Sequence, residues 1–186
     1  MGSLLFLVTG SAGTGKSEVC RALKQQGYEA YDTDDDGLAR WQNNKTGYIH
    51  PKSSVKAEQR TEAFIWEHSW VVPRQYFEDI RNSSGRKPVF ICGSLGNENK
   101  VRDLFHTVFA LYVDDDTLMR RLATRVNNDW GKQPHELEQT LKFHREVYDK
   151  HRKLGDTIID ATRPVSEVVD EIVNLTSDLN GQRPVN

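Results

Sequence analysis

The fold is decided by the stretch Gly10-Ser11-Ala12-Gly13-Thr14-Gly15-Lys16-Ser17, an unbroken match to the pattern of glycine, four residues, glycine, lysine and serine or threonine. The apolar run Leu4–Val8 comes directly before it and predicts a buried strand. Residues 16–23 follow with the spacing of an opening helix. A glycine-rich turn that contained Lys-Ser by chance would need neither a strand before it nor a helix after it. We therefore expect residues 10–17, the phosphate loop, to join a strand to a helix.

The residue types of the phosphate loop suit the binding of a nucleotide. Its glycines, at positions 10, 13 and 15, allow positive φ and a close approach of backbone to phosphate oxygens. Successive N–H groups and the positive end of the helix dipole then converge on the anion. Lys16 can reach the β and γ phosphates, and the Ser17 hydroxyl can ligate Mg²⁺. We expect all eight residues to contribute to the nucleotide site.

The chain as a whole predicts one α/β domain over residues 1–186. The net charge of -2 gives no global basic field, so nucleic acid is not expected as an obligate partner. Cys20 and Cys92 lack metal-type spacing and are interpreted as buried, reduced thiols, which favours a cytoplasmic location. The apolar start at Leu4 is too short to span a bilayer, and no other segment suggests a membrane span.

An acidic cluster follows the second predicted strand, Tyr28–Tyr31. The carboxyl ends of parallel strands form the ligand-binding edge of a sheet, so the cluster at residues 32–36 should face the phosphate loop. Asp32 and Asp34 alternate along an extended segment and should share a face, where they can serve a magnesium water and a substrate hydroxyl respectively. The remaining aspartates, 35 and 36, are interpreted as caps of a short helix over residues 37–41.

An insertion on the substrate side is expected over about residues 38–86. Residues 42–56 are polar and predict a surface loop, while aromatic residues at helical spacing predict a helix within residues 54–69 and another over residues 73–80. Aromatic residues at such spacing indicate core packing more often than a stacking platform. Arg60 is the first candidate for gripping an anionic substrate, although an ordinary surface charge explains it too.

The apolar run Pro88–Cys92 predicts a third strand, and Gly93 follows it. A glycine there permits close approach of substrate or nucleotide, although a tight turn into a helix over residues 98–105 also accounts for it. No acidic residue stands in or directly after this strand. The second magnesium-holding carboxylate of phosphate-loop enzymes would therefore be supplied by Asp32 or Asp34.

The fourth strand, Val108–Val113, leads through three aspartates that should cap the following helix. Arg121 and Arg125 share a face of that helix and point to a short lid over about residues 126–133. Arginines delivered by a lid can neutralise charge on a transferred phosphoryl group, while a solvated basic face is the alternative. A long helix should start at Pro134, with its histidines (135, 144 and 151) on the surface and without metal companions.

The pattern ends with a fifth strand over residues 156–160 and a last helix from Pro164. This alternation of strands and helices resembles the small P-loop kinases, a group that includes the nucleoside monophosphate kinases, shikimate kinase and their relatives. The resemblance covers roughly residues 4–179. It implies a three-layer P-loop fold with a five-stranded parallel sheet, helices on both faces and a short lid, and ATP with Mg²⁺ as cofactors. Residues 159–164, which include Thr162, Arg163 and Pro164, resemble the loop that lies against the adenine, and Arg121 resembles the arginine packed over the nucleotide.

The resemblance is weaker on the acceptor side. Shikimate kinases carry three consecutive glycines where this chain has Gly93-Ser94-Leu95-Gly96, and the acidic residue and proline–arginine step of nucleoside monophosphate kinases are also absent. The polar motifs at residues 127–129 and 131–132 are similar to those of uncharacterised bacterial ATP-binding proteins of this superfamily. These departures leave the acceptor open.

Three hypotheses follow from the motifs and the resemblance. The first is a kinase that transfers the γ-phosphoryl group of ATP to a small molecule, with Lys16, Asp34 and Arg125 as catalytic residues. For this kinase, a nucleoside or nucleotide acceptor is preferred over a shikimate-like one. The second is a nucleotide-dependent switch, ATPase or regulatory ATP-binding protein whose partner binds the face of Trp41, Trp66 and Trp70. The third is a polynucleotide 5′-kinase, which the near-neutral charge disfavours.

Overall fold

The computed structural model describes residues 3–52, 54–83, 85, 87–124, 126 and 134–181. In these ranges the chain forms a five-stranded parallel sheet with the strand order β2-β5-β1-β6-β7. The strands are β1 (Leu5–Thr9), β2 (Glu29–Asp32), β5 (Val89–Cys92), β6 (Phe105–Tyr112) and β7 (Thr157–Asp160). Strand β1 lies in the middle, where Leu5 pairs with Val89 on one side and with Phe105 on the other. The phosphate loop therefore leaves the sheet from its central strand.

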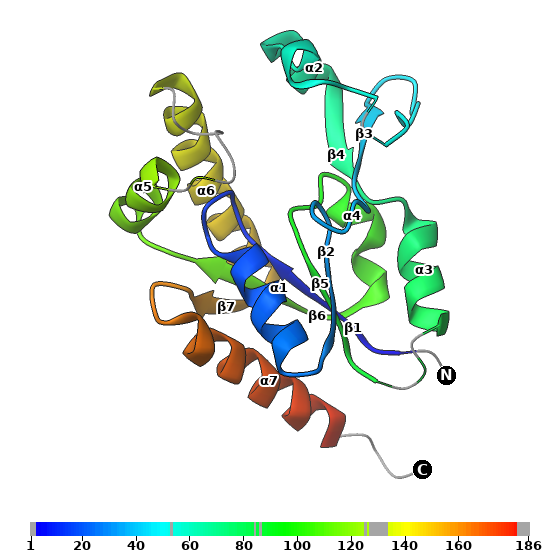
Figure 1. The fold of residues 1–186 in the computed structure, drawn as a ribbon, viewed down its shortest axis with the longest axis vertical. Helices are drawn as coiled ribbons and strands as arrows, with labels where there is room; N and C mark the ends of the chain where they lie inside the picture. The colour runs from blue at the N-terminus through cyan, green and yellow to red at the C-terminus, as the bar shows by residue number, and fades with distance from the viewer. Residues whose placement is uncertain are drawn as a thin grey trace.

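Helices cover both faces of the sheet (Figure 1). On one face, α1 (Lys16–Gln25) and α7 (Val165–Gly181) pack against Phe6 and Val8, together with α5 (Asp115–Thr124). On the other, α3 (Arg74–Ser83) and α4 (Glu98–Val101) pack against Leu5 and Leu7. Helix α6 (Pro134–Leu154) also reaches this second face, where its His144 stacks on Tyr112 and its Tyr148 packs against Tyr112 at a tilt. The arrangement confirms the expected three-layer α/β fold.

The insertion after β2 differs from the prediction. Residues 37–41 are not a helix, because β3 (Arg40–Asn43) pairs antiparallel with β4 (His68–Val71). The helix predicted within residues 54–69 is reduced to a 3₁₀ turn, η1 (Ala57–Gln59), and to α2 (Glu62–Glu67). Cross-strand packing of Trp41 on Trp70, with ring centroids 5.0 Å apart, explains why these aromatic residues favour a hairpin over a helix. In Figure 1 the hairpin and α2 project beyond the sheet.

Gly96 and Asn97, which follow β5, bind the base of this hairpin by hydrogen bonds. Asn97 donates from Nδ2 to Val72 O at 2.9 Å and accepts from Val72 N at 3.3 Å. The Gly96 amide donates to Trp70 O at 2.8 Å, and a Cβ at position 96 would lie only 2.8 Å from the same carbonyl oxygen. The insertion thus has a fixed base, although α2 at its far end contributes no buried residue.

The helix after β6 begins as predicted. Asp114 Oδ1 accepts a hydrogen bond from Thr117 N at 2.8 Å, and this bond lowers the pKa of the Asp114 carboxyl. The helix predicted over residues 98–105 is split into α4 and a 3₁₀ turn, η2 (Arg102–Leu104).

Cys20 and Cys92 are buried free thiols, and the hydrogen bond between them lowers the pKa of Cys20 and raises that of Cys92. Within the described ranges, no helix combines the length and the apolar character needed to cross a bilayer.

Candidate functional site

The phosphate loop has the backbone conformation that its sequence predicts. Gly13 and Gly15 have φ values of 89° and 101°, and Gly15 forms the left-handed N-cap of α1. A Cβ at position 13 would also lie 2.9 Å from Leu118 Cδ1, so a side chain there would strain the backbone and force Leu118 to shift. The loop therefore leads directly from the end of β1 into the positive end of the α1 dipole.

Side chains hold the carbonyl groups of the loop. Gly10 O accepts hydrogen bonds from Lys16 Nζ at 3.0 Å and from Ser94 Oγ at 2.6 Å. Ser11 O accepts from Lys16 Nζ at 2.7 Å and from Thr14 Oγ1 at 2.9 Å. Ser11 and Thr14 are completely buried. The loop is thus locked by its own side chains and by one serine from the end of β5.

Amide groups of the loop are left available for an anion. The backbone N–H groups of Gly13, Gly15 and Ser17 donate no hydrogen bond to any other described residue. An amide without a protein acceptor is satisfied by solvent or a ligand, and three of them at a helix N-terminus fit the oxygens of a polyphosphate. The half-buried Ser17 stands in the first turn of α1, where a hydroxyl ligand for Mg²⁺ is expected.

Arg121 is brought to the phosphate loop from α5. Its Nη1 donates to Thr14 O at 3.3 Å and its Nη2 to Ala161 O at 2.8 Å. One guanidinium therefore joins the loop to the segment that follows β7, and its position over a bound nucleotide stays a prediction. Arg125 and residues 127–133 of the expected lid lie outside the described residues.

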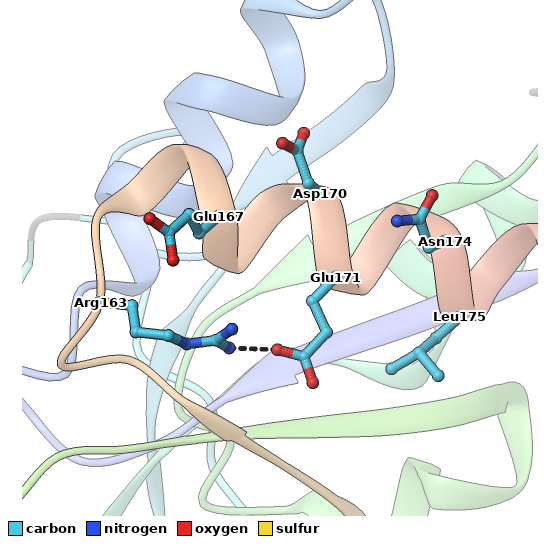
Figure 2. Close-up of a pocket in the computed structure, with 6 residues that line it drawn as sticks. All are labelled: Arg163, Glu167, Asp170, Glu171, Asn174 and Leu175. Carbon is cyan, nitrogen blue, oxygen red and sulfur yellow. Dashed lines mark hydrogen bonds and ion pairs between the residues drawn. The ribbon is translucent and has the colours of Figure 1, made fainter.

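The segment after β7 forms a tight turn. Asp160 Oδ1 accepts hydrogen bonds from Thr162 N at 2.9 Å and from Thr162 Oγ1 at 2.6 Å, which lower the pKa of the Asp160 carboxyl. Figure 2 shows the Arg163 side chain directed along α7 to its ion-pair partner Glu171. Both residues line an open groove of about 480 Å³, and no phosphate-loop residue contributes to it. Of residues 162–164, Thr162 and Pro164 remain exposed.

The acidic cluster is organised as a turn rather than as an extended segment. Asp32 is only 5 % exposed, and its Oδ1 accepts from Asp34 N at 2.9 Å and from Asp35 N at 3.0 Å. The expectation of a common face for Asp32 and Asp34 rested on strand alternation, which stops at Asp32. The exposed Asp34 instead accepts a hydrogen bond from Trp70 Nε1 at 2.7 Å. The structure thus places one carboxylate inside the turn and the other against the hairpin.

The outer aspartates of the cluster have separate roles. Asp36 pairs with Lys24 of α1 at 2.8 Å and accepts from Asp32 N, also at 2.8 Å. The negative charge of Asp32 raises the pKa of the Asp35 carboxyl. Neither residue caps a helix over residues 37–41, because that helix is not formed. Asp36 stabilises the turn that presents Asp34.

The two other predicted acceptor residues gain no functional contact from the structure. A Cβ at Gly93 would lie 1.9 Å from Thr33 Oγ1, so the glycine accommodates the Thr33 side chain. Arg60 is exposed and forms no hydrogen bond or ion pair within the described part of the chain. Both therefore stay predictions. Ser94, in contrast, was missed as a site residue, although a polar residue after a central strand ends at the same edge as the phosphate loop.

The prediction for the histidines of α6 was wrong for two of them. His144 and His151 are 2 % and 1 % exposed, respectively. His151 Nδ1 lies 2.7 Å from Asp156 Oδ2, and its Nε2 lies 3.7 Å from Glu98 Oε2. These three residues are close enough to offer ligand atoms to a metal. However, Arg102 pairs with both carboxylates, which makes an ion-pair network the better interpretation.

Lys150 completes this network. Its Nζ lies 2.8 Å from Glu98 Oε2, so Glu98 pairs with two cations. A divalent ion would have to compete with both of them. The network links α4 to the C-terminal part of α6 through ion pairs. The insertion, in contrast, is held mainly at its base.

Comparison with known proteins supports the three-layer α/β fold that the sequence predicts. A family model described as an AAA domain matches residues 7–142. No match was found among curated proteins. A gluconokinase from Sinorhizobium meliloti has a TM-score of 0.56 and 18 % identity, with 97 % of this chain and 98 % of that chain covered. The shikimate kinase from Aquifex aeolicus has a TM-score of 0.56, 18 % identity and coverages of 97 % and 100 %.

A deoxyadenosine kinase from M. mycoides is also similar, with a TM-score of 0.54, 14 % identity and coverages of 94 % and 100 %. At identities this low, a likeness shows the fold and carries neither activity nor substrate. The chain has the fold of the small P-loop kinases, as its resemblance to them implied.

Proposed function

The chain belongs to the AAA domain family, and on that premise we propose that it is a magnesium-dependent kinase, transferring the γ-phosphoryl group of ATP to a small molecule. The observation that carries the proposal is the phosphate loop, whose carbonyl groups are held by side chains while the amides of Gly13, Gly15 and Ser17 have no acceptor in the described chain. Such a cradle binds polyphosphate through its backbone.

The donor side would work through groups already near the loop. Lys16 now bonds to two loop carbonyls and would turn its ammonium to the β and γ phosphates. Ser17 and Asp32 are the residues that would hold Mg²⁺, directly or through water, and the bound ion neutralises phosphate charge. Arg121 and Arg125 would close over the nucleotide and stabilise the charge of the transferred group.

The acceptor side would work through Asp34. This exposed carboxylate can orient an acceptor hydroxyl or take its proton, and the Trp70 indole N–H fixes one of its oxygens. We propose a nucleoside or nucleotide as the acceptor, with Arg60 and Gly93 as further contacts. The similar structures are named as kinases of three kinds, and they support a small-molecule acceptor without selecting one.

The decisive experiment is an acceptor screen. Purified protein would be incubated with ATP, Mg²⁺ and a mixed panel of nucleosides, nucleotides, sugar acids and shikimate-like compounds, and the products read by mass spectrometry. We expect one compound class to gain a phosphate, and the Lys16→Ala variant to give none. DNA and RNA 5′ ends belong in the same panel, and their failure to be labelled would exclude a polynucleotide kinase. Absence of any phosphorylated product would contradict the proposal.

A nucleotide-dependent switch is the second candidate, and the exposure of Trp66 favours it. This side chain on α2 is 75 % exposed, whereas Trp41 and Trp70 pack on one another. An exposed indole at the end of an insertion suits a partner protein. ATP-dependent capture of a partner, combined with no phosphorylated product in the screen, would favour the switch.

The free thiols Cys20 and Cys92 support the expected cytoplasmic location in either case.

A further inference from the structure

The imidazole of His144 is buried against the phosphate loop. Its Nδ1 lies 2.7 Å from Ser11 Oγ and its Nε2 lies 2.7 Å from Val113 O. The side chain is 2 % exposed, so neither nitrogen has access to bulk water. Both ring nitrogens thus have a protein partner at hydrogen-bond distance, one in the loop and one just beyond β6.

Chemistry assigns the direction of these two hydrogen bonds. A carbonyl oxygen only accepts, so Nε2 must carry the hydrogen that is donated to Val113 O. In the neutral ring, Nδ1 is then an acceptor, and the Ser11 hydroxyl donates to it. The Tyr112 ring stacks on the imidazole with centroids 5.1 Å apart and planes at 7°, and Tyr148 packs on Tyr112 at 4.2 Å. The plane and the tautomer of His144 are therefore both set by its surroundings.

Ser11 provides one of the two carbonyl groups that hold the lysine of the loop, and Gly10 provides the other. The Ser11 carbonyl oxygen accepts from Lys16 Nζ at 2.7 Å and from Thr14 Oγ1 at 2.9 Å. A rotation of Ser11 would displace both contacts, and the completely buried Thr14 hydroxyl would then lose its acceptor away from bulk water. The hydroxyl bond to His144 is the contact that fixes Ser11 from outside the loop.

We propose that His144 is a positioning residue that holds Ser11, and through it the phosphate loop, in the conformation that binds nucleotide. The residue comes from α6, which starts directly after the segment expected to form the lid. The inference uses the proposed function only for the choice of ATP as ligand. It concerns the affinity of the donor site, and not the identity of the acceptor.

A double-mutant cycle tests the proposal. His144→Phe keeps an aromatic ring against Tyr112 but removes both hydrogen bonds, and Ser11→Ala removes only the hydroxyl. We expect each variant to raise the Kd for MgATP about fivefold, the effect of one hydrogen bond. The double variant should bind MgATP no more weakly than the weaker single variant, because both changes break the same contact.

Matched measurements separate positioning from packing. Tyr148→Leu removes a ring from the same helix and from the same stack without touching the loop, so it should lower Tm while leaving the Kd for MgATP unchanged. The ¹⁵N spectrum of the histidine side chains should show His144 as the Nε2–H tautomer in the wild type. The KM for ATP should rise in both site variants, with the KM for the acceptor unchanged.

Additive effects of His144→Phe and Ser11→Ala on the Kd would overturn the proposal, as would an unchanged Kd in Ser11→Ala. The Ser11→Ala result decides the matter alone if His144→Phe does not fold. A wild-type protein that binds MgATP but phosphorylates nothing would contradict the proposed function and leave the proposal to be judged by the cycle. A wild-type protein that binds no MgATP would overturn both.

Discussion

The donor side and the acceptor side of the molecule are built differently. Residues of the phosphate loop are contacted by side chains from three other places: Ser94 after β5, Arg121 on α5 and His144 on α6. Asp34, the central residue of the proposed acceptor side, is exposed and accepts from the Trp70 indole N–H at 2.7 Å and from the neighbouring Thr33 Oγ1 at 3.5 Å. Beyond it, α2 buries no side chain. One half of the site is fixed, and the other is only anchored at its base.

This difference indicates where substrate binding changes the structure. A loop whose carbonyls are already bonded loses little conformational entropy when phosphate binds, so the donor side is preorganised. The hairpin of β3 and β4 has few contacts that would be broken by movement, and segments of this kind close on substrates. Acceptor binding should therefore be coupled to ordering of the insertion, which also excludes water from the transferred phosphoryl group.

The largest effect is expected from Lys16→Ala, which removes the cation of the donor side. Phosphoryl transfer depends on charge stabilisation, and loss of such a group costs at least about 100-fold in kcat. Turnover of the wild type and the variant should be compared under saturating ATP. The Arg21→Ala variant is the control, because Arg21 is an exposed cation on the same helix that pairs with Glu18. Equal turnover of Lys16→Ala and wild type would refute the role of the loop lysine.

Asp34→Asn should have the next largest effect, and should affect only the acceptor side. The amide cannot take a proton, so kcat should fall on the order of 100-fold, while the Kd for MgATP stays within twofold. Asp35→Asn is the matched control, since it removes a neighbouring exposed charge that bonds to nothing in the proposed site. If Asp34→Asn retains wild-type turnover, Asp34 is not the acceptor-side carboxylate.

Arg121→Ala should weaken nucleotide binding by about tenfold, because its guanidinium joins Thr14 O to Ala161 O and would lie over the nucleotide. The Kd for MgATP is the measurement, by calorimetry. Arg120→Ala provides the comparison, since the Arg120 side chain bonds to Thr117 within its own helix. A change in acceptor KM at constant ATP affinity would instead move Arg121 to the acceptor side.

The smallest effect is expected from Trp70→Phe. This change keeps an aromatic ring in the hairpin but removes the N–H that fixes Asp34, which should lower kcat/KM for the acceptor about fivefold, corresponding to about 1 kcal/mol. Trp66→Phe, at an exposed position, should change nothing in the transfer reaction. Equal losses from the two variants would argue that the indole contact is incidental.

The sheet and the donor side could be predicted from the sequence because their signals are local. Strands β1 and β5 are short apolar runs, and their predicted boundaries differ from the observed ones by at most one residue. The glycines of the phosphate loop have the predicted positive φ. In these segments the residue types, the backbone conformation and the burial all agree, so the sequence alone is informative.

The helix starting at Pro134 was predicted, but its buried face and the hairpin inside the insertion could not be, for two physical reasons. Trp41 and Trp70 are partners across a hairpin, and a pairing between distant residues has no local period. In α6, the buried face contains Thr140, His144 and His151, whereas Phe143 is 51 % exposed. A hydrophobic pattern selects the wrong face of such a helix, because its buried side chains are satisfied by hydrogen bonds instead of by apolar contact.

The strand order affects how the protein is made. Strand β1 is synthesised well before its two neighbours in the sheet, β5 and β6. Pairing at such separation closes long loops and is slow. Until then both edges of an apolar strand are unpaired, which is a state prone to aggregation. The phosphate loop therefore gains its supporting strands only after β6 has been synthesised, and residues 1–104 alone should not bind nucleotide.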